Sequence, residues 1–307
     1  MCEQRDVGLG VEPFSTGVIP LGKICALLSL AAIWGISVPV TKLGLLSMPP
    51  LTLTALRFGI AVPVLAFLIM NMPPLPWKAV APLALLGVVG IGIGQIAQSL
   101  GVARTPASIG TILSATIPVF VVVFATIRLK QSITRTQILG IAVAFGGIAV
   151  VATGGPSTET AATLAGPLLV LASALAIAFY YVWSVELTHQ YGSLAVAAWS
   201  TFFGFAALLP WAIWEASFTP FQLTLPAIGA ATFLGLFVTV AGLLLWLNIL
   251  REIPARVASS VQFLQPVFGI ATSTFIFQDQ IGSQFVMGVI LILTGLALTV
   301  HSRRQAA

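Results

Sequence analysis

The sequence predicts an all-α membrane protein in which ten transmembrane helices form two inverted-topology five-helix repeats. Three observations predict this fold class: a composition too apolar for water, ten apolar stretches of spanning length, and a match between the two halves. Of the 307 residues, 58% are hydrophobic and 7% are charged, and the mean hydropathy is +1.08. A soluble globular protein carries roughly 25% charged residues. A lipid bilayer must therefore cover most of this chain.

The ten predicted spans follow one another along nearly the whole chain. A membrane helix needs about 20 mostly apolar residues, and clusters of Pro, Gly, Ser and Thr separate most of the stretches that reach this length. We place the spans at 24–46, 51–71, 79–101, 106–128, 135–153, 164–187, 193–214, 226–250, 255–277 and 282–300.

The lysines and arginines predict which way the spans run. With the N-terminus in the cytosol, ten of the 13 basic residues fall on the cytosolic side, as the positive-inside rule requires for a plasma (inner) membrane protein. The other three, Lys42, Arg57 and Arg104, lie near the outer ends of spans. They are expected either to snorkel to the interface or to form an electropositive outer vestibule.

The two halves of the chain match at a fixed offset. Residues 105–151 align without gaps on 253–299, 148 residues later. Prolines and glycines carry the match, because helix interiors in water disfavour both residues. The matched pairs are Pro106 with Pro254, Pro118 with Pro266, Gly140 with Gly288, Gly147 with Gly295 and, upstream, Gly94 with Gly242.

Each half therefore contains five spans, at 24–153 and 164–301, joined by an external linker at 154–163. Segments 1–23 and 302–307 are expected to be cytosolic tails, since the first lacks the apolar core of a signal peptide. An odd number of spans inverts the second half relative to the first, a plan common among secondary transporters. Such a plan offers two near-symmetric packings, a physical basis for alternating access. Duplication kept only for stability is the competing interpretation.

Several short motifs resemble those of a known family. They are Ala32-Ile33-Trp34-Gly35 in the first span, Arg57-Phe58 in the second, the run from Ala103 to Pro118, and the run from Ile253-Pro254-Ala255 to Gln265-Pro266. Together they make the chain similar to the drug/metabolite transporter superfamily, and within it to ten-span proteins with two EamA-type domains. The resemblance implies transport of amino acids, other metabolites, vitamins or drugs. It also implies a packing or anchoring role for the arginine that opens the second span.

Polar residues beside the two matched mid-span prolines are candidates for a substrate site, because polar groups inside a membrane tend to face a bundle interior or a water-filled cavity. Pro118 and Pro266 are the predicted hinges. Residues three apart share a helix face. Two such rows match at the offset: Ser108, Thr111 and Ser114 in the fourth span, and Arg256, Ser259, Gln262 and Gln265 in the ninth. For the small residues, hydrogen bonding between packed helices is the alternative.

Two further glutamines belong to the predicted cavity. Gln95 and Gln98 lie one turn apart in the third span. The nearby Gly90 and Gly94 indicate close helix packing rather than nucleotide binding, since no strand precedes them.

Three aromatic residues complete the predicted substrate site. Trp34, Tyr180 and Tyr181 lie too deep in their spans to belong to the aromatic belt of the interface. They are expected either to fill core volume or to enclose an organic solute near Gln262.

The acidic residues bear on how transport is driven. None of the eight lies at the centre of a predicted span, whereas a proton-driven pump commonly uses a buried carboxylate. Glu186 and His189 at the inner mouth are the coupling candidates. The other interpretation, which we favour, is facilitated diffusion or exchange without proton coupling.

No motif indicates an enzyme or a bound cofactor. Both histidines lie at membrane edges, no His/Cys/Asp cluster has metal-ligand spacing, and no Walker loop occurs. The basic residues form no stripe that would bind nucleic acid. The expected partners are a small organic solute and the lipid bilayer, without metal, cofactor or nucleic acid.

The expected function is a secondary transporter that exports small organic metabolites such as amino acids, by alternating access around a midplane cavity. One monomer is expected to suffice, because it contains both halves. Uptake of a vitamin-like or nucleoside-like solute is the alternative within this class. A channel-like pore or a membrane scaffold is the alternative outside it; short polar rows between apolar turns favour a closed chamber over a continuous pore lining.

Overall fold

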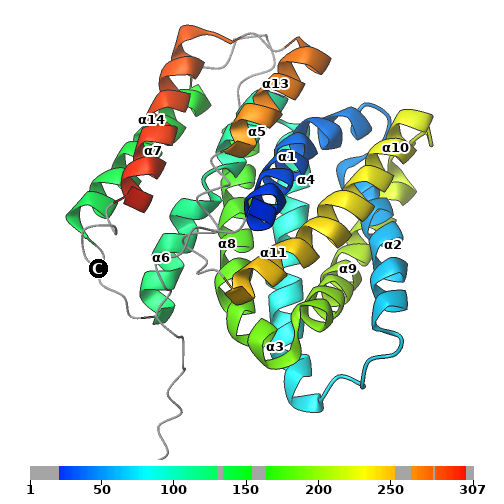
Figure 1. Cartoon of the computed structure of the whole chain (residues 1–307). Coiled ribbons are helices and arrows are strands. Elements are labelled where there is room, and N and C mark those ends of the chain that lie inside the picture. The colour runs from blue at the N-terminus through cyan, green and yellow to red at the C-terminus, as the bar shows by residue number, and fades with distance from the viewer. Residues whose placement is uncertain (1–20, 130–133, 154–163, 253–263, 279–280, 302–307) are drawn as a thin grey trace, which may run out of the picture.

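The structure, a computed structural model of the chain, describes residues 21–129, 134–153, 164–252, 264–278 and 281–301. Most of the expected N-terminal tail, the central linker and the C-terminal tail lie outside these residues. Within the described ranges every regular element is a helix, which confirms the predicted all-α class (Figure 1).

The helices follow the predicted order of spans, and three of the spans are divided into pieces. In chain order they are α1 (Leu21–Gly44), α2 (Pro50–Ile69), α3 (Trp77–Leu86) continued by η1 (Gly87–Ile93) and α4 (Gly94–Ala103), α5 (Ala107–Ser114), α6 (Ile117–Leu129), α7 (Arg135–Thr153), α8 (Ala165–Tyr191), α9 (Ser193–Phe218), α10 (Leu225–Phe233) continued by η2 (Leu234–Ala241) and α11 (Gly242–Glu252), α13 (Gln265–Phe277) and α14 (Ser283–His301).

Each of the ten predicted spans contains at least one described apolar helix, although only residues 264–277 of the ninth span are described. Seven segments are long and apolar enough to cross a membrane, and three shorter apolar helices lie at Ile138–Gly147, Gln265–Phe277 and Ser283–Gly295. Helix α8 runs beyond its predicted end and stops at Tyr191, because Gly192 adopts a φ of 86° that reverses the chain into α9. This left-handed conformation is open to glycine at little steric cost.

The third and eighth spans share an irregularity that no sequence pattern predicted. Each contains a π-helical segment, η1 or η2, at positions that the 148-residue offset relates. The α-helix resumes at Gly94 in one span and at the matched Gly242 in the other. Segments of π-helix are rare and occur frequently at functional sites. The shared position shows that the two halves repeat in structure as well as in sequence.

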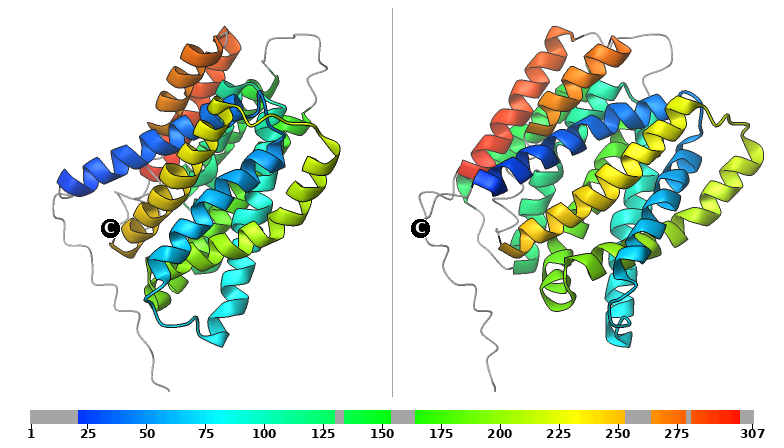
Figure 2. Two further views of the ribbon diagram at one scale, coloured as in Figure 1. Left: turned by 90° about the vertical axis from the view of Figure 1, so that its right-hand side faces the viewer. Right: turned by 45° about the vertical axis from the view of Figure 1, so that its right-hand side comes forward.

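The fifth and tenth spans cross through the matched glycines. A methyl group added at Gly147 would lie 2.7 Å from the carbonyl oxygen of Gly288, and one at Gly295 would meet the carbonyl oxygen of Gly140. Helices α7 and α14 consequently pack side by side at one edge of the bundle (Figure 1 and Figure 2). The reciprocal contacts, first half on second and second half on first, are those expected of two inverted repeats.

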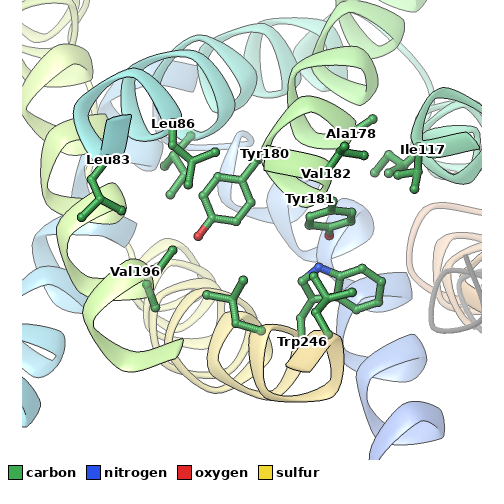
Figure 3. Packing of buried hydrophobic residues seen from close by; sticks show 14 of the residues in the cluster. Leu83, Leu86, Ile117, Ala178, Tyr180, Tyr181, Val182, Val196 and Trp246 are labelled. Atoms are coloured by element: carbon green, nitrogen blue, oxygen red, sulfur yellow. The ribbon is translucent and has the colours of Figure 1, made fainter. Parts of the chain in front are cut away.

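The main hydrophobic core lies where α3, η1, α8, α9 and α11 meet. Tyr180 and Tyr181 of α8 and Trp246 of α11 converge at its centre (Figure 3). Trp246 is completely buried. This aromatic centre borders the cavity described next.

Candidate functional site

A cavity of about 110 Å³ lies between the two halves of the chain. Its walls come from α1, α2, η1, α4, α5 and α6 of the first half and from α8, η2, α11 and α13 of the second. Seven of the ten predicted substrate-binding residues line it: Trp34, Gln95, Gln98, Ser114, Tyr180, Tyr181 and Gln265.

The other predicted site residues fall into two groups. Thr111 is buried but does not line the cavity, because its side chain packs against Gly269 of α13. Its hydroxyl donates to the carbonyl oxygen of Ala107 in its own helix (2.8 Å) and so does not make the hydrogen bond between helices that was the alternative. Ser259 and Gln262, together with Arg256 in the same row, lie outside the described residues.

Arg57 is the main member of the site that sequence reasoning misplaced. It was expected near the outer end of its span. The span begins where it was predicted, within one residue, as α2 at Pro50, and the seven residues from there to Arg57 span about 10 Å, deep enough for Arg57 to line the cavity. Its side chain is buried, with 9% of its surface exposed. Its Nε donates to the hydroxyl of Thr239 (2.8 Å) and one Nη donates to Oε1 of Gln95 (2.9 Å). A charged residue within an apolar span was the available signal.

Three small hydroxyl residues of the cavity wall were also missed. Ser37 donates to the carbonyl oxygen of Trp34 (2.6 Å) and Thr41 to that of Ser37 (2.8 Å), so both bond along their own helix. Thr239 accepts from Arg57 and donates to the carbonyl oxygen of Leu234 (2.9 Å), five residues back in η2. The spacing of Trp34, Ser37 and Thr41 places them on one helix face, which could have indicated that Ser37 and Thr41 line the same cavity as Trp34.

An aromatic layer closes one end of the cavity. Trp34 stacks on Tyr181 with ring centroids 5.8 Å apart and an interplanar angle of 13°. Trp246 contacts both rings, at 5.6 Å from Trp34 and 4.6 Å from Tyr181. The indole nitrogen of Trp34 donates to the carbonyl oxygen of Val238 in η2 (3.2 Å), which ties α1 to the second half. In the predicted orientation Tyr181 and Trp246 belong to the cytosolic halves of their spans, so this layer lies on the cytosolic side of the cavity.

The two predicted hinge prolines stand in the first turns of the described helices α6 and α13. Helix α5 ends at Ser114, and α6 begins at Ile117, one residue before Pro118. Helix α13 likewise begins at Gln265, one residue before Pro266. Proline suits the first turn of a helix, because the N–H groups there have no partner within the helix. Both new helices start at the cavity, so their N-terminal ends add partial positive charge to it.

The other two outer basic residues do not form a free vestibule. The ammonium of Lys42 donates to the carbonyl oxygens of Val102 (3.0 Å), Ala103 (3.2 Å) and Thr105 (3.0 Å) and so caps the C-terminus of α4. Arg104 donates to the carbonyl oxygen of Leu100 in its own helix (3.0 Å). The expectation of an electropositive outer vestibule is therefore wrong for Lys42, and the buried Arg57 supplies the positive charge of the site instead.

The coupling candidates lie away from the cavity. Glu186 pairs with Arg128 at 2.8 Å, and both side chains are exposed. His189 is exposed near the end of α8. Neither residue lines the cavity, so neither contacts a solute bound there.

Known proteins share both the sequence pattern and the fold. The model of the EamA-like transporter family matches residues 21–153 and again residues 164–301. An uncharacterized transporter of Archaeoglobus fulgidus is 26% identical over 270 residues, which cover 88% of this chain and 95% of the relative. The uncharacterized inner membrane transporter YedA of Escherichia coli is 28% identical over 256 residues, 81% of each chain.

Two further similarities concern one relative and one solved structure. A probable terminal-alkyne amino-acid exporter of Streptantibioticus cattleyicolor is 28% identical over 232 residues, 73% of this chain and 76% of that protein. A protein of known crystal structure, 16% identical, superposes with a TM-score of 0.67 over 93% of this chain and 98% of its own, which shows a shared fold. Since the family model covers both halves, the chain belongs to the EamA-like transporter family and is a multi-pass membrane transporter, not an enzyme.

Proposed function

We propose that this chain is a secondary transporter that exports small organic metabolites such as amino acids, by alternating access around the central cavity. The observation that carries the proposal is the cavity itself, in which a few polar groups converge on a largely aromatic and aliphatic chamber. Sites for small organic ligands have this composition. Arg57 can receive a carboxylate, and Trp34, Tyr180 and Tyr181 can hold an organic body.

Three features support alternating access. The repeats are inverted, the fourth span is broken beside the cavity, and the ninth has a helix start at the matched position, as in other transporters with discontinuous helices. The π-helical segments place further irregular backbone at the same level. Thr41 and Gln98 of the cavity wall lie toward the predicted outer ends of their helices, whereas the aromatic layer lies on the other side.

The orientation, the tails and the repeat boundaries belong to the same proposal. With both termini in the cytosol of a bacterial-type inner membrane, as the distribution of basic residues predicts, the cavity faces outward. We assign the repeats to 24–153 and 164–301, with an external linker between them. Because Glu186 and His189 lie away from the cavity, facilitated diffusion or exchange is the mode that we favour.

Counterflow in proteoliposomes tests the proposal. Purified protein should accumulate a labelled amino acid from outside when the same unlabelled amino acid is present in excess inside. Replacing Gln95 and Gln265 together by Leu should abolish this flux while the protein still elutes as a folded species. Gln222→Leu is the matched control, because Gln222 is exposed in the connection before α10. Wild-type flux in the double variant would refute the site, and stepwise single-channel currents would instead establish a pore.

A further inference from the structure

We propose that the substrate crosses as a net anion, a carboxylate without a free ammonium group, and that the membrane potential drives its export. The inference rests on the proposed transporter function, replaces amino acids as its example substrates by carboxylates without an ammonium group, and adds the driving force. It follows from the charges around the cavity, from the donors left on Arg57, and from the thermodynamics of a charged solute.

The described walls of the cavity contain a positive charge and no negative one. Arg57 bonds only to neutral partners, the hydroxyl of Thr239 and the amide of Gln95. The carboxylate of Glu186 pairs with Arg128, and that of Glu215 accepts from the backbone and hydroxyl of Thr52. The sequence of residues 253–263, which lie outside the described residues, contains no Asp or Glu. The carboxylate that balances Arg57 must therefore come with the solute.

The guanidinium has the donors that a carboxylate needs. It carries five N–H groups, and two of them are used by Thr239 and Gln95. No other acceptor among the described residues takes the remaining three. Two parallel N–H groups of an arginine match the two oxygens of a carboxylate. The N-terminal ends of α6 and α13 at the cavity wall favour the same sign of charge.

An ammonium group would have no charged partner in the described walls. They offer it only neutral acceptors, such as the side-chain oxygens of Gln98 and Gln265, and place it in the same cavity as the guanidinium of Arg57, a like charge. The faces of Trp34 and Tyr181 offer cation–π attraction, which is weaker than an ion pair in such surroundings. The same rings suit an apolar or aromatic carbon skeleton. A carboxylic acid is therefore bound better than the amino acid with the same skeleton.

The charge of the solute sets the direction of transport. In facilitated diffusion the protein charges return to their starting positions at the end of the cycle, so one turnover moves only the charge of the solute. A cytosolic membrane face that is electrically negative expels an anion. The concentration ratio at balance changes tenfold for about 59 mV when one charge moves. Export then requires no coupled proton, in agreement with the positions of Glu186 and His189 away from the cavity.

The experiment compares solutes that differ only in charge. We would record charge movement by full-length protein in proteoliposomes on a solid-supported membrane, with 3-phenylpropanoate, phenylalanine and 3-phenylpropanamide. The aliphatic set is 4-methylpentanoate, leucine and 4-methylpentanamide. Passive diffusion of a protonated acid moves no charge, so the current reports the transporter alone. The acids should give currents that reverse at a potential shifting by about 59 mV per tenfold gradient, and thermal shift should show about tenfold tighter binding than the amino acids or amides.

Three variants separate the charge of Arg57 from its packing. Arg57→Gln should bind acid and amide equally, and its binding of the amide shows that it is folded. Arg57→Lys should keep a preference for the acid. Arg104→Gln removes a positive charge outside the cavity and should behave as wild type.

Two results would overturn the inference. One is equal or better binding of phenylalanine or the amide by the wild-type protein. The other is flux of labelled solute that does not respond to the imposed potential. Neither result contradicts the proposed transporter function as long as counterflow of a labelled solute is observed. Absence of flux for these solutes and for a full amino-acid panel would refute both.

Discussion

The hydrogen bond between Arg57 and Thr239 permits a test of how the two halves are held together at the cavity. Thr239→Val keeps the shape of the side chain and removes the oxygen that accepts from Nε of Arg57 at 2.8 Å. Hydrogen bonds to charged groups contribute about 1.5–3 kcal/mol, whereas side-chain hydrogen bonds in membrane proteins average about 0.6 and reach about 1.7 kcal/mol. Because the donor is charged and buried, we expect a loss near the upper membrane value, about 1.5 kcal/mol.

The assay is equilibrium unfolding in mixed micelles with increasing dodecyl sulfate, followed by tryptophan fluorescence. Thr126→Val in α6 is the matched control, because the hydroxyl of Thr126 donates to the carbonyl oxygen of Val122 in its own helix (2.8 Å) and to no charged group. The control should lose less than about 0.6 kcal/mol. If Thr239→Val is no more destabilising than Thr126→Val, the bond to Arg57 does not join the two halves in the way described here.

Three other changes test separate parts of the structure. Gly147→Ala should lower the free energy of unfolding by about 1–3 kcal/mol, because the added methyl group overpacks the crossing of α7 and α14. Gly146→Ala should leave the melting temperature unchanged, because its methyl group would have no neighbour within 4 Å; equal effects of the two variants would contradict the crossing. Glu186→Gln breaks an exposed ion pair and should cost less than about 1 kcal/mol, and flux should not depend on an imposed pH gradient in either the wild type or the variant. A gradient-dependent flux in the wild type that the variant lacks would restore Glu186 as a coupling residue. Lys42→Met should lower the melting temperature, because it removes the ammonium group that caps α4. The decrease should be the same at low and high salt, because Lys42 bonds to backbone carbonyl oxygens and not to a carboxylate; an unchanged melting temperature would refute the cap.

The sequence by itself determined the class of protein, the number of spans and the repeat. Those properties depend on quantities that add up locally: hydropathy over about 20 residues, and matched prolines and glycines at one offset. The matched glycines were a sound signal, because Gly147 meets Gly288 and Gly295 meets Gly140 where the two helices cross. Polar and aromatic residues deep within spans could also be identified from the sequence as candidates for the cavity, since the cost of burying a polar group in a membrane limits where such residues are tolerated.

Only the tertiary structure decided what those residues contact. Arg57 bonds to Gln95, 38 residues away, and to Thr239, 182 residues away, and no local pattern indicates such pairings. Hydropathy predicted the start of α2 within one residue. It does not report how α2 packs against α4 and η2, or the π-helical segment η2 on which the position of Thr239 depends. Thr111 and Ser114 share one helix face, yet one meets the backbone of α13 and the other lines the cavity. Periodicity identifies the face of a helix, whereas the packing of the neighbouring helices decides whether that face meets protein or an open cavity.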